Sequence, residues 1–204
     1  MSKYYQKSDF FQKPSNVLMV SSSKSPHIYS AGILPYQVDE NNKIYFLMGK
    51  DTSGMWSDFG GKCEFQDKNN IKETAAREFF EESLNSVIDI NTTREMLKND
   101  KNYVLINSKT ISNSPYYMFV LRVPMLPDTT RDRFKKTLQY LQYTNAKYES
   151  LEKTDVKWVS MDTILHCLNY PEQEKELGWP LRKVFRKTLY NNKKYLNELK
   201  NRLL

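Results

Sequence analysis

Phe59-Gly60-Gly61-Lys62, followed after fourteen intervening residues by Arg77-Glu78-Phe79-Phe80-Glu81-Glu82, is the most informative stretch of this chain. Glu78, Glu81 and Glu82 stand at i, i+3 and i+4, so a helix would carry all three on one face. Like charges at that spacing destabilise a helix unless a partner neutralises them. A hard divalent cation bound by oxygens would do so, and Mg²⁺ is the usual ion beside phosphates.

The opposite side of this stretch is apolar, which predicts a helix over residues 71–84 anchored on a core. Its apolar residues are Ile71, Ala75, Ala76, Phe79 and Phe80. The preceding pair Gly60-Gly61 is expected to form a turn, where glycine allows positive φ and close approach to a ligand or ion. The alternative is an acidic face that is only solvated.

Alternating and apolar patterns elsewhere predict a mixed α/β fold over residues 28–204, preceded by an arm over residues 1–27. Strands are expected at residues 28–36, 43–50, 56–59, 102–108, 116–124 and 155–159. Further helices are expected at residues 131–143, 161–168 and 181–199. The helix over 131–143 is interpreted as an insertion near the site, and the helix over 181–199 as amphipathic with a basic face.

Composition limits the class of protein. A chain of 204 residues with 39% hydrophobic residues can form one domain with a packed core. No apolar run approaches the roughly 18 residues that a membrane span needs, and the N-terminus lacks the apolar stretch of a secretory signal. Cys63 and Cys167 lack CxxC spacing, which argues against a disulfide framework or a zinc site and favours a cytoplasmic location.

The net charge of +7 is unevenly distributed. Residues 1–27 carry +3 and residues 180–204 carry +7, which leaves 7 − 3 − 7 = −3 for the centre. An acidic centre between basic ends suits a polyanionic substrate larger than a mononucleotide. The alternative is that the lysine-rich end only keeps the protein in solution.

Residues Gly61 to Asn85 resemble the Nudix box, whose pattern is Gly, five residues, Glu, seven residues, Arg-Glu-apolar-any-Glu-Glu-any-Gly-apolar. The resemblance implies an α/β/α sandwich with a mixed sheet and hydrolysis of a nucleoside diphosphate linked to another group, with Mg²⁺ or Mn²⁺. The spacing from Gly61 to Arg77 is two residues longer than the pattern. The first Glu position falls on Asp67 counted forward and on Asn69 counted backward, and we expect the loop over residues 66–70 to absorb the insertion.

Two other positions depart from the box. Leu84 stands at the closing Gly position and Asn85 follows it. Because Asn tolerates the left-handed conformation that ends helices, the helix is expected to run one residue longer. Phe59 replaces the usual proline before the glycine pair.

By this resemblance, Glu78, Glu81 and Glu82 would bind the metal together with the backbone carbonyl of Gly60. Arg77 would orient the carboxylates, since its guanidinium makes bidentate bonds to them.

The resemblance also implies a catalytic base on a loop near the end of the sheet, and Glu149 and Glu152 are the candidates. We prefer Glu152, because residues 152–158 resemble the segment that carries this glutamate in mRNA-decapping Nudix enzymes. Glu152 could equally face water, and Glu78 is then the alternative base.

Lys62, beside the glycine pair, is a candidate for binding substrate. Tyr36, Trp56 and Phe59 could stack on a base or cap, although each could instead belong to the core. His27 and His166 are isolated in the sequence, so no Ser/His/Asp or Cys/His arrangement is evident.

The function predicted from these features is Mg²⁺-dependent hydrolysis of a phosphoanhydride. Among substrates we favour the capped 5′ end of RNA, because the basic ends could bind a polynucleotide backbone. One alternative is a small substrate such as a dinucleoside polyphosphate or a nucleotide sugar. Another is a catalytically silent Nudix fold that binds a nucleotide or RNA.

Overall fold

A seven-stranded mixed sheet and six α-helices make up the part of the chain that the computed structural model describes, residues 29–125, 129–144 and 151–201. The strands are β1 (Ser30–Val38), β2 (Ile44–Asp51), β3 (Trp56–Ser57), β4 (Phe59–Lys62), β5 (Tyr103–Lys109), β6 (Pro115–Arg122) and β7 (Lys153–Ser160). The α-helices are α1 (Ile71–Glu82), α2 (Ile90–Lys98), α3 (Thr130–Tyr143), α4 (Met161–Asn169), α5 (Lys183–Asn191) and α6 (Lys193–Asn201). Short 3₁₀ turns are η1 (Phe65–Asp67), η2 (Asp100–Asn102) and η3 (Pro171–Gln173). The predicted arm over residues 1–27 lies outside the described residues. None of the helices in the described ranges has the length and hydropathy of a membrane span.

β1 is the strand that joins the two halves of the sheet. Its first residues pair antiparallel with β4 and its last with β2, while its other edge pairs parallel with β6. β5 pairs antiparallel with β6, and β7 and β3 pair antiparallel with β2. This arrangement confirms the predicted mixed α/β fold and places β4, with its two glycines, beside the central strand.

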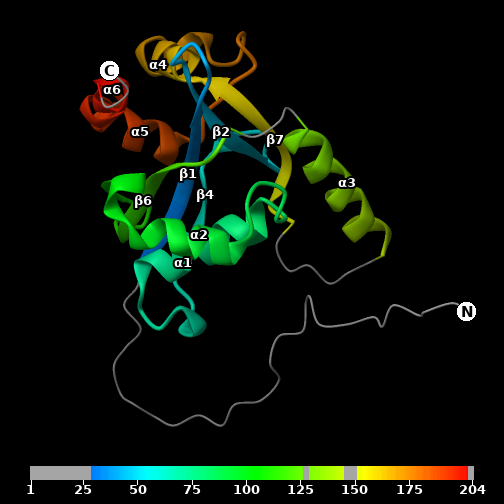
Figure 1. Cartoon of the computed structure of the whole chain (residues 1–204). Coiled ribbons are helices and arrows are strands. Elements are labelled where there is room, and N and C mark those ends of the chain that lie inside the picture. The colour runs from blue at the N-terminus through cyan, green and yellow to red at the C-terminus, as the bar shows by residue number, and fades with distance from the viewer. Residues whose placement is uncertain (1–28, 126–128, 145–150, 202–204) are drawn as a thin grey trace, which may run out of the picture.

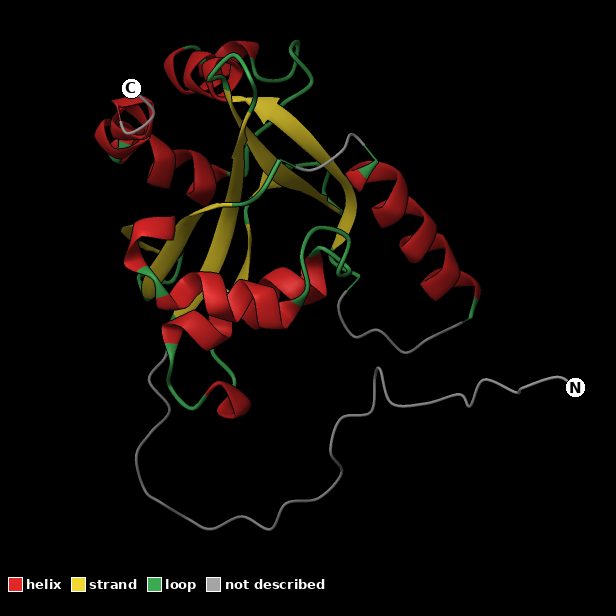
Figure 2. Ribbon diagram, in the orientation of Figure 1, coloured by secondary structure: helices red, strands yellow, loops and turns green. Residues whose placement is uncertain are grey.

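Helices cover both faces of the sheet (Figures 1 and 2). α1, α2 and α3 pack on one face and α4, α5 and α6 on the other, each group over its own hydrophobic core. Ile33 and Leu34, adjacent in β1, lie in opposite cores, as the alternation of a strand requires. The layers therefore form the α/β/α sandwich that the box resemblance implied.

α1 is fixed on the sheet by its apolar side. Ala75, Ala76 and Phe79 are fully buried, and the Phe79 ring packs edge-on against Phe59 of β4 with centroids 5.4 Å apart. The side chain of Asn70 caps the helix start by accepting from the N–H of Lys72 at 3.0 Å. The acidic residues of α1 are thereby held over the glycines of β4.

α1 ends at Glu82, so the prediction that it extends to Leu84 is wrong. Leu84 and Asn85 both adopt left-handed φ of 53°. Their N–H groups donate to the carbonyls of Glu81 and Phe80 at 3.2 and 3.1 Å, which is a Schellman motif with leucine at the glycine position. Leu84 is buried in the core, which offsets the cost of its left-handed backbone.

The expected turn at Gly60-Gly61 is also corrected. Both residues lie in β4 and neither has positive φ; the positive-φ glycines in the described ranges are Gly54 and Gly178. The glycines are needed there for close approach of other groups, as the site shows, rather than for a turn.

The predicted helix over residues 181–199 is two helices, α5 and α6, separated at Asn192. Asn192 leaves the helical region with φ −120° and ψ 21°, and its side-chain amide donates to the carbonyl of Thr188 at 2.8 Å. Asparagine competes in this way for backbone groups that a continuous helix would use.

Candidate active site

On each face of β4, a side chain from another element occupies the space that a side chain at Gly60 or Gly61 would need. A Cβ on Gly61 would lie 2.5 Å from Oε1 of Glu78, so the Glu78 carboxylate packs directly on the strand backbone. A Cβ on Gly60 would lie 2.5 Å from the hydroxyl of Tyr116 on the other side. Any side chain at either position would displace these groups.

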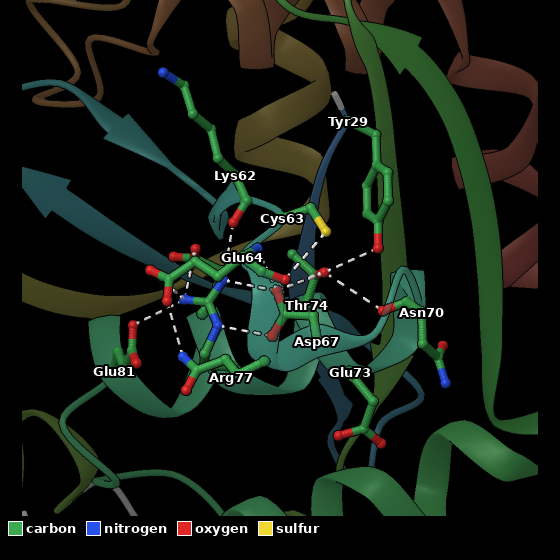
Figure 3. Close-up of polar contacts among 12 residues, drawn as sticks. Tyr29, Lys62, Cys63, Glu64, Asp67, Asn70, Glu73, Thr74, Arg77 and Glu81 are labelled. Carbon is green, nitrogen blue, oxygen red and sulfur yellow. Dashed lines mark hydrogen bonds and ion pairs between the residues drawn. The ribbon is translucent and has the colours of Figure 1, made fainter. Parts of the chain in front are cut away.

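Arg77 is the centre of the polar network beside β4 (Figure 3). Its guanidinium donates to both carboxylate oxygens of Asp67, at 2.9 and 3.0 Å, and to the carbonyl of Lys62 at 2.8 Å. The same group pairs with Glu78 at 2.9 Å and Glu81 at 3.1 Å. Arg77 therefore orients two of the three predicted metal ligands while being held from behind by Asp67.

Asp67 takes the first Glu position of the box as counted forward from Gly61. It is buried, and it also accepts from the hydroxyl of Thr74 at 2.9 Å and the N–H of Glu64 at 2.8 Å. The two extra residues follow it: Lys68 and Asn69 both have left-handed φ, 51° and 58°. The predicted loop thus absorbs the insertion after Asp67 without displacing the partner of Arg77.

Glu82 lies deepest of the three glutamates. Its side chain is 3% exposed, against 13% for Glu78 and 33% for Glu81. Its Oε2 accepts from the N–H of Gly60 at 2.7 Å, and its Oε1 lies 3.6 Å from Nζ of Lys153. The three carboxylates thus share a helix face but differ in depth and partner.

Lys153 is a buried cation that the sequence reasoning missed. Its Nζ donates to Oγ of Ser57 at 2.8 Å. A Cβ on Gly49 would lie 2.8 Å from Cδ of Lys153, so the aliphatic part of the lysine packs directly on the backbone of Gly49. A register shift of the β2–β7 pair beside Lys50 and Asp51 breaks the simple alternation of β7. For that reason strand periodicity gave no signal that this lysine faces inward.

Asp58 and Tyr116 form a second buried polar pair that the sequence did not indicate. The Tyr116 hydroxyl donates to the Asp58 carboxylate and lies against Gly32 and Gly60. Burial raises the pKa of Asp58, although Tyr116 and Lys153 act against it.

The electrostatics of the cluster favour protonated carboxylates when no cation is bound. Burial raises the pKa of Glu82 to about 8 against the opposing charge of Lys153. Burial also raises the pKa of Glu78 to about 7, with Arg77 opposing and Glu81 and Glu152 adding to the rise. Asp67 differs: burial opposes its ionisation, but hydrogen bonds from Arg77 and other donors outweigh this and lower its pKa.

The predicted base Glu152 lies immediately before β7 and is exposed. Its charge contributes to the raised pKa of both Glu78 and Glu82, so it belongs to the same electrostatic cluster. Glu149, the other candidate, lies outside the described residues.

The predicted aromatic contacts to substrate are not available in this fold. Phe59 is fully buried, and Tyr36 and Trp56 are 8% and 5% exposed within the core on the α4–α6 face. All three rings belong to the hydrophobic cores, which is the alternative to stacking on a base or cap. Lys62, in contrast, is exposed, and its side chain points away from the Arg77 network (Figure 3).

His166 is a structural residue, since its ring bonds Gln173 at 2.8 Å and stacks on Tyr170. Cys63 and Cys167 are both free thiols.

The carboxylate and carbonyl oxygens of the site are ligands suited to a hard divalent cation, although they do not surround a common point in this structure. Within the described ranges, no group of three acidic, histidine or cysteine side chains is arranged around a common point. Glu82 is nevertheless buried and Glu78 partly buried, and desolvation raises the pKa of both carboxyls. The charge of Glu81 adds to the rise for Glu78, and the charge of Glu78 adds to the rise for Glu82. A cation bound by oxygens would relieve both effects, so Glu78, Glu82, Glu81 and the Gly60 carbonyl are the groups that could hold it.

No protein-family model matches this chain. No curated protein matches it either. The chain is similar to solved structures that include a C. elegans Ap4A hydrolase binary complex, with 14% identity, 83% of this chain and 98% of that chain covered, and a TM-score of 0.46. It is also similar to a MutT protein from Methanosarcina mazei Go1 (19% identity, 87% and 99% covered, TM-score 0.45) and a Nudix hydrolase described from Listeria monocytogenes (18%, 84% and 96%, 0.46).

Proposed function

We propose that this chain is a Nudix-type, Mg²⁺- or Mn²⁺-dependent hydrolase that cleaves a nucleoside diphosphate linked to a second group. The observation that carries this proposal is the cluster of Glu78 and Glu82 against Gly60 and Gly61, with Arg77 fixed by Asp67 behind it. A solvated acidic face would need neither buried carboxylates nor a clamped arginine.

In this mechanism the carboxylates of Glu78, Glu81 and Glu82 and the carbonyl of Gly60 would hold the cation. The cation, when bound, supplies charge neutralisation on the phosphates and lowers the pKa of water. Arg77 keeps Glu78 and Glu81 oriented toward the substrate, and the exposed ammonium of Lys62 binds a phosphate oxygen.

Glu152 would accept the proton of the attacking water. Its exposure allows contact with that water, and its charge already influences Glu78 and Glu82. Glu78 is the alternative base, because its carboxylate lies in the same cluster and packs against Gly61. Glu152→Gln that retains full turnover assigns the role to Glu78.

Among substrates we favour the capped 5′ end of RNA over small nucleotides. The basic C-terminal segment is the support for this choice, because its lysines and arginines could neutralise a polynucleotide backbone. A panel of capped RNA, dinucleoside polyphosphates and nucleotide sugars, assayed with Mg²⁺ and Mn²⁺, separates the substrate classes. Nucleotide binding without turnover of any of them identifies a silent binding module.

The decisive variant is Glu82→Gln, which keeps the shape of the side chain and removes its charge. We expect turnover to fall on the order of 100-fold or more, since a metal site contributes several kcal/mol to the barrier. Glu73→Gln is the matched control: it lies on the same helix, but its carboxylate pairs with Arg94 at 2.8 Å outside the site. Equal activity of both variants would contradict the metal assignment.

A further inference from the structure

A groove of about 900 Å³ lies between the β5–β6 hairpin and α5, apart from the carboxylate cluster. From the hairpin it is lined by Asn107, Lys109 and Ile111, and from α5 by Lys183, Lys187 and other side chains. We refer to these residues as the lysine groove. No acidic residue of the described ranges lines it.

Its three lysines are uncompensated cations. Lys109, Lys183 and Lys187 are all exposed, and none of them forms an ion pair with another described residue. Lys183, Lys187 and Asn191 follow one another at four-residue intervals, so they form one stripe along α5 that faces the hairpin. Positive charges gathered around one hollow attract a polyanion.

The walls of the groove are rigid. Phe185 and Leu189 anchor α5 in the core, with exposures of 4% and 0%. Ser108 of β5 and Thr188 of α5 share a hydrogen bond of 2.6 Å between their hydroxyls. The backbone positions that carry the lysines are therefore fixed relative to one another, so no rearrangement of the helix or hairpin is needed on binding.

The sheet connects the lysine groove to the candidate active site. Lys62, Ser30, Tyr116 and Ser108 are successive partners across β4, β1, β6 and β5. Three steps of about 4.8 Å between strands separate Lys62 from Ser108 by about 14 Å. Along β4, Lys62 and Gly60 point to one face and Gly61, which faces Glu78 of α1, to the other, so Lys62 points to the face that α5 covers.

We propose that the lysine groove binds the phosphodiester backbone of a single-stranded RNA whose 5′ end occupies the carboxylate cluster. This inference rests on the proposed function for the position of the 5′ end. The three lysines contact phosphates, the asparagine side chains hydrogen-bond the nucleotides, and exposed Ile111 gives an apolar surface for a base. Binding is independent of sequence, because the charge contacts are to the backbone.

The test measures binding of a fluorescently labelled, uncapped single-stranded RNA of about 20 nucleotides by anisotropy at several salt concentrations. The groove variant is Lys109→Glu/Lys183→Glu/Lys187→Glu in the full chain. The matched control is Lys43→Glu/Lys136→Glu/Lys175→Glu, three exposed lysines elsewhere with the same change in net charge. We expect the groove variant to weaken binding by about tenfold or more and to reduce the salt slope by about 2, since each phosphate contact contributes about 0.7. Equal effects of the two variants, or no effect of the groove variant, overturn the proposal.

Hydrolysis separates this inference from the proposed function. We expect the groove variant to cleave a capped dinucleotide at the wild-type rate within about twofold, but to require more capped RNA of about 20 nucleotides for half-maximal rate. If the groove variant cleaves both substrates with unchanged KM, the proposed function stands and the proposal for the lysine groove is wrong. If the wild-type protein cleaves neither substrate but binds RNA through these lysines, the proposal for the lysine groove stands and the proposed function is wrong.

Discussion

At the scale of single residues, Arg77 explains how a cluster of carboxylates persists inside a fold. Its five N–H donors reach two glutamates on its own helix, one backbone carbonyl and both oxygens of Asp67. A lysine offers a point charge and could not satisfy this fork geometry. The position of Glu78 therefore depends on a residue, Asp67, that touches no substrate.

Asp67→Asn tests this dependence. The substitution keeps the size of the side chain but leaves Arg77 without its buried counter-charge, so we expect a loss of about 3 kcal/mol in the free energy of unfolding. Glu64→Gln is the control, because Glu64 is half exposed and 3.7 Å from Arg77, and it should cost less than about 1 kcal/mol. Urea unfolding followed by circular dichroism measures both, and equal costs would contradict the clamp.

Lys153 and Glu82 should be energetically coupled. Lys153→Met leaves the Glu82 carboxylate buried with one N–H donor, from Gly60, while Glu82→Gln leaves the ammonium without its charge partner. In a double-mutant cycle in metal-free buffer at about pH 9, where Glu82 is ionised, we expect a coupling of about 1–3 kcal/mol. Additive effects of the two substitutions would show that the 3.6 Å approach contributes nothing.

At the scale of elements, the sequence predicted most strands and helices because their apolar patterns are strong. β1 and β2 end within two residues of the predicted positions, and the helix predicted from Phe134, Leu138 and Leu141 is α3, with those residues buried. α2 was not predicted, since only Thr93 and Leu97 are buried in it. Apolar periodicity in the sequence predicts a helix or strand only where one side of that element is clearly apolar.

The sequence predicted the charged residues of the candidate site but not how deeply each of them is buried. The spacing of Glu78, Glu81 and Glu82 indicated a shared face, and counting forward from Gly61 placed Asp67 at the first Glu position of the box, with Asn69 as the alternative. That Asp67 is the partner of Arg77 came only from the structure. Spacing could not show that Glu82 is buried, because that depends on Lys153, which approaches from a strand 71 positions further along the chain. It also could not show that aromatic residues beside the glycines belong to the core.

The loop between η1 and α1 contains a residue, Lys68, with a strained backbone conformation. Lys68 is exposed and has left-handed φ of 51°, which costs a non-glycine residue about 1 kcal/mol. We expect Lys68→Gly to raise the free energy of unfolding by up to about 1 kcal/mol. Lys43→Gly, at an exposed lysine without positive φ, should lower it instead, and thermal unfolding of both variants measures the difference.

At the scale of the whole molecule, charge is divided between two places. The carboxylate cluster lies between α1 and β4, and the uncompensated lysines lie where α5 meets the β5–β6 hairpin. β1 and β6 lie between them and contribute buried residues to the sheet, which keeps the two charged sites at a fixed distance. A polyanion with one end at the cluster would meet the lysines along its length.

The carboxylate cluster also makes the stability of the whole fold depend on pH. Glu78 and Glu82 release protons near pH 4.5 when unfolded, but at about 7 and about 8 in the folded, metal-free protein. Between these values the folded state binds more protons than the unfolded state, so the free energy of unfolding falls as pH rises. We therefore expect the metal-free melting temperature to decrease from about pH 5 to about pH 9.

Excess Mg²⁺ should reverse this trend, because the ion binds only ionised carboxylates and stabilises the state that binds it. The gain in melting temperature on adding Mg²⁺ is expected to be larger at about pH 9 than at about pH 5, where protons compete for the same oxygens. Glu78→Gln/Glu82→Gln removes both titrating groups and should lose both the pH slope from this cluster and the gain from Mg²⁺. Differential scanning calorimetry of the two proteins at both pH values is the measurement. An equal Mg²⁺ gain in the double variant would locate the bound ion elsewhere on the molecule.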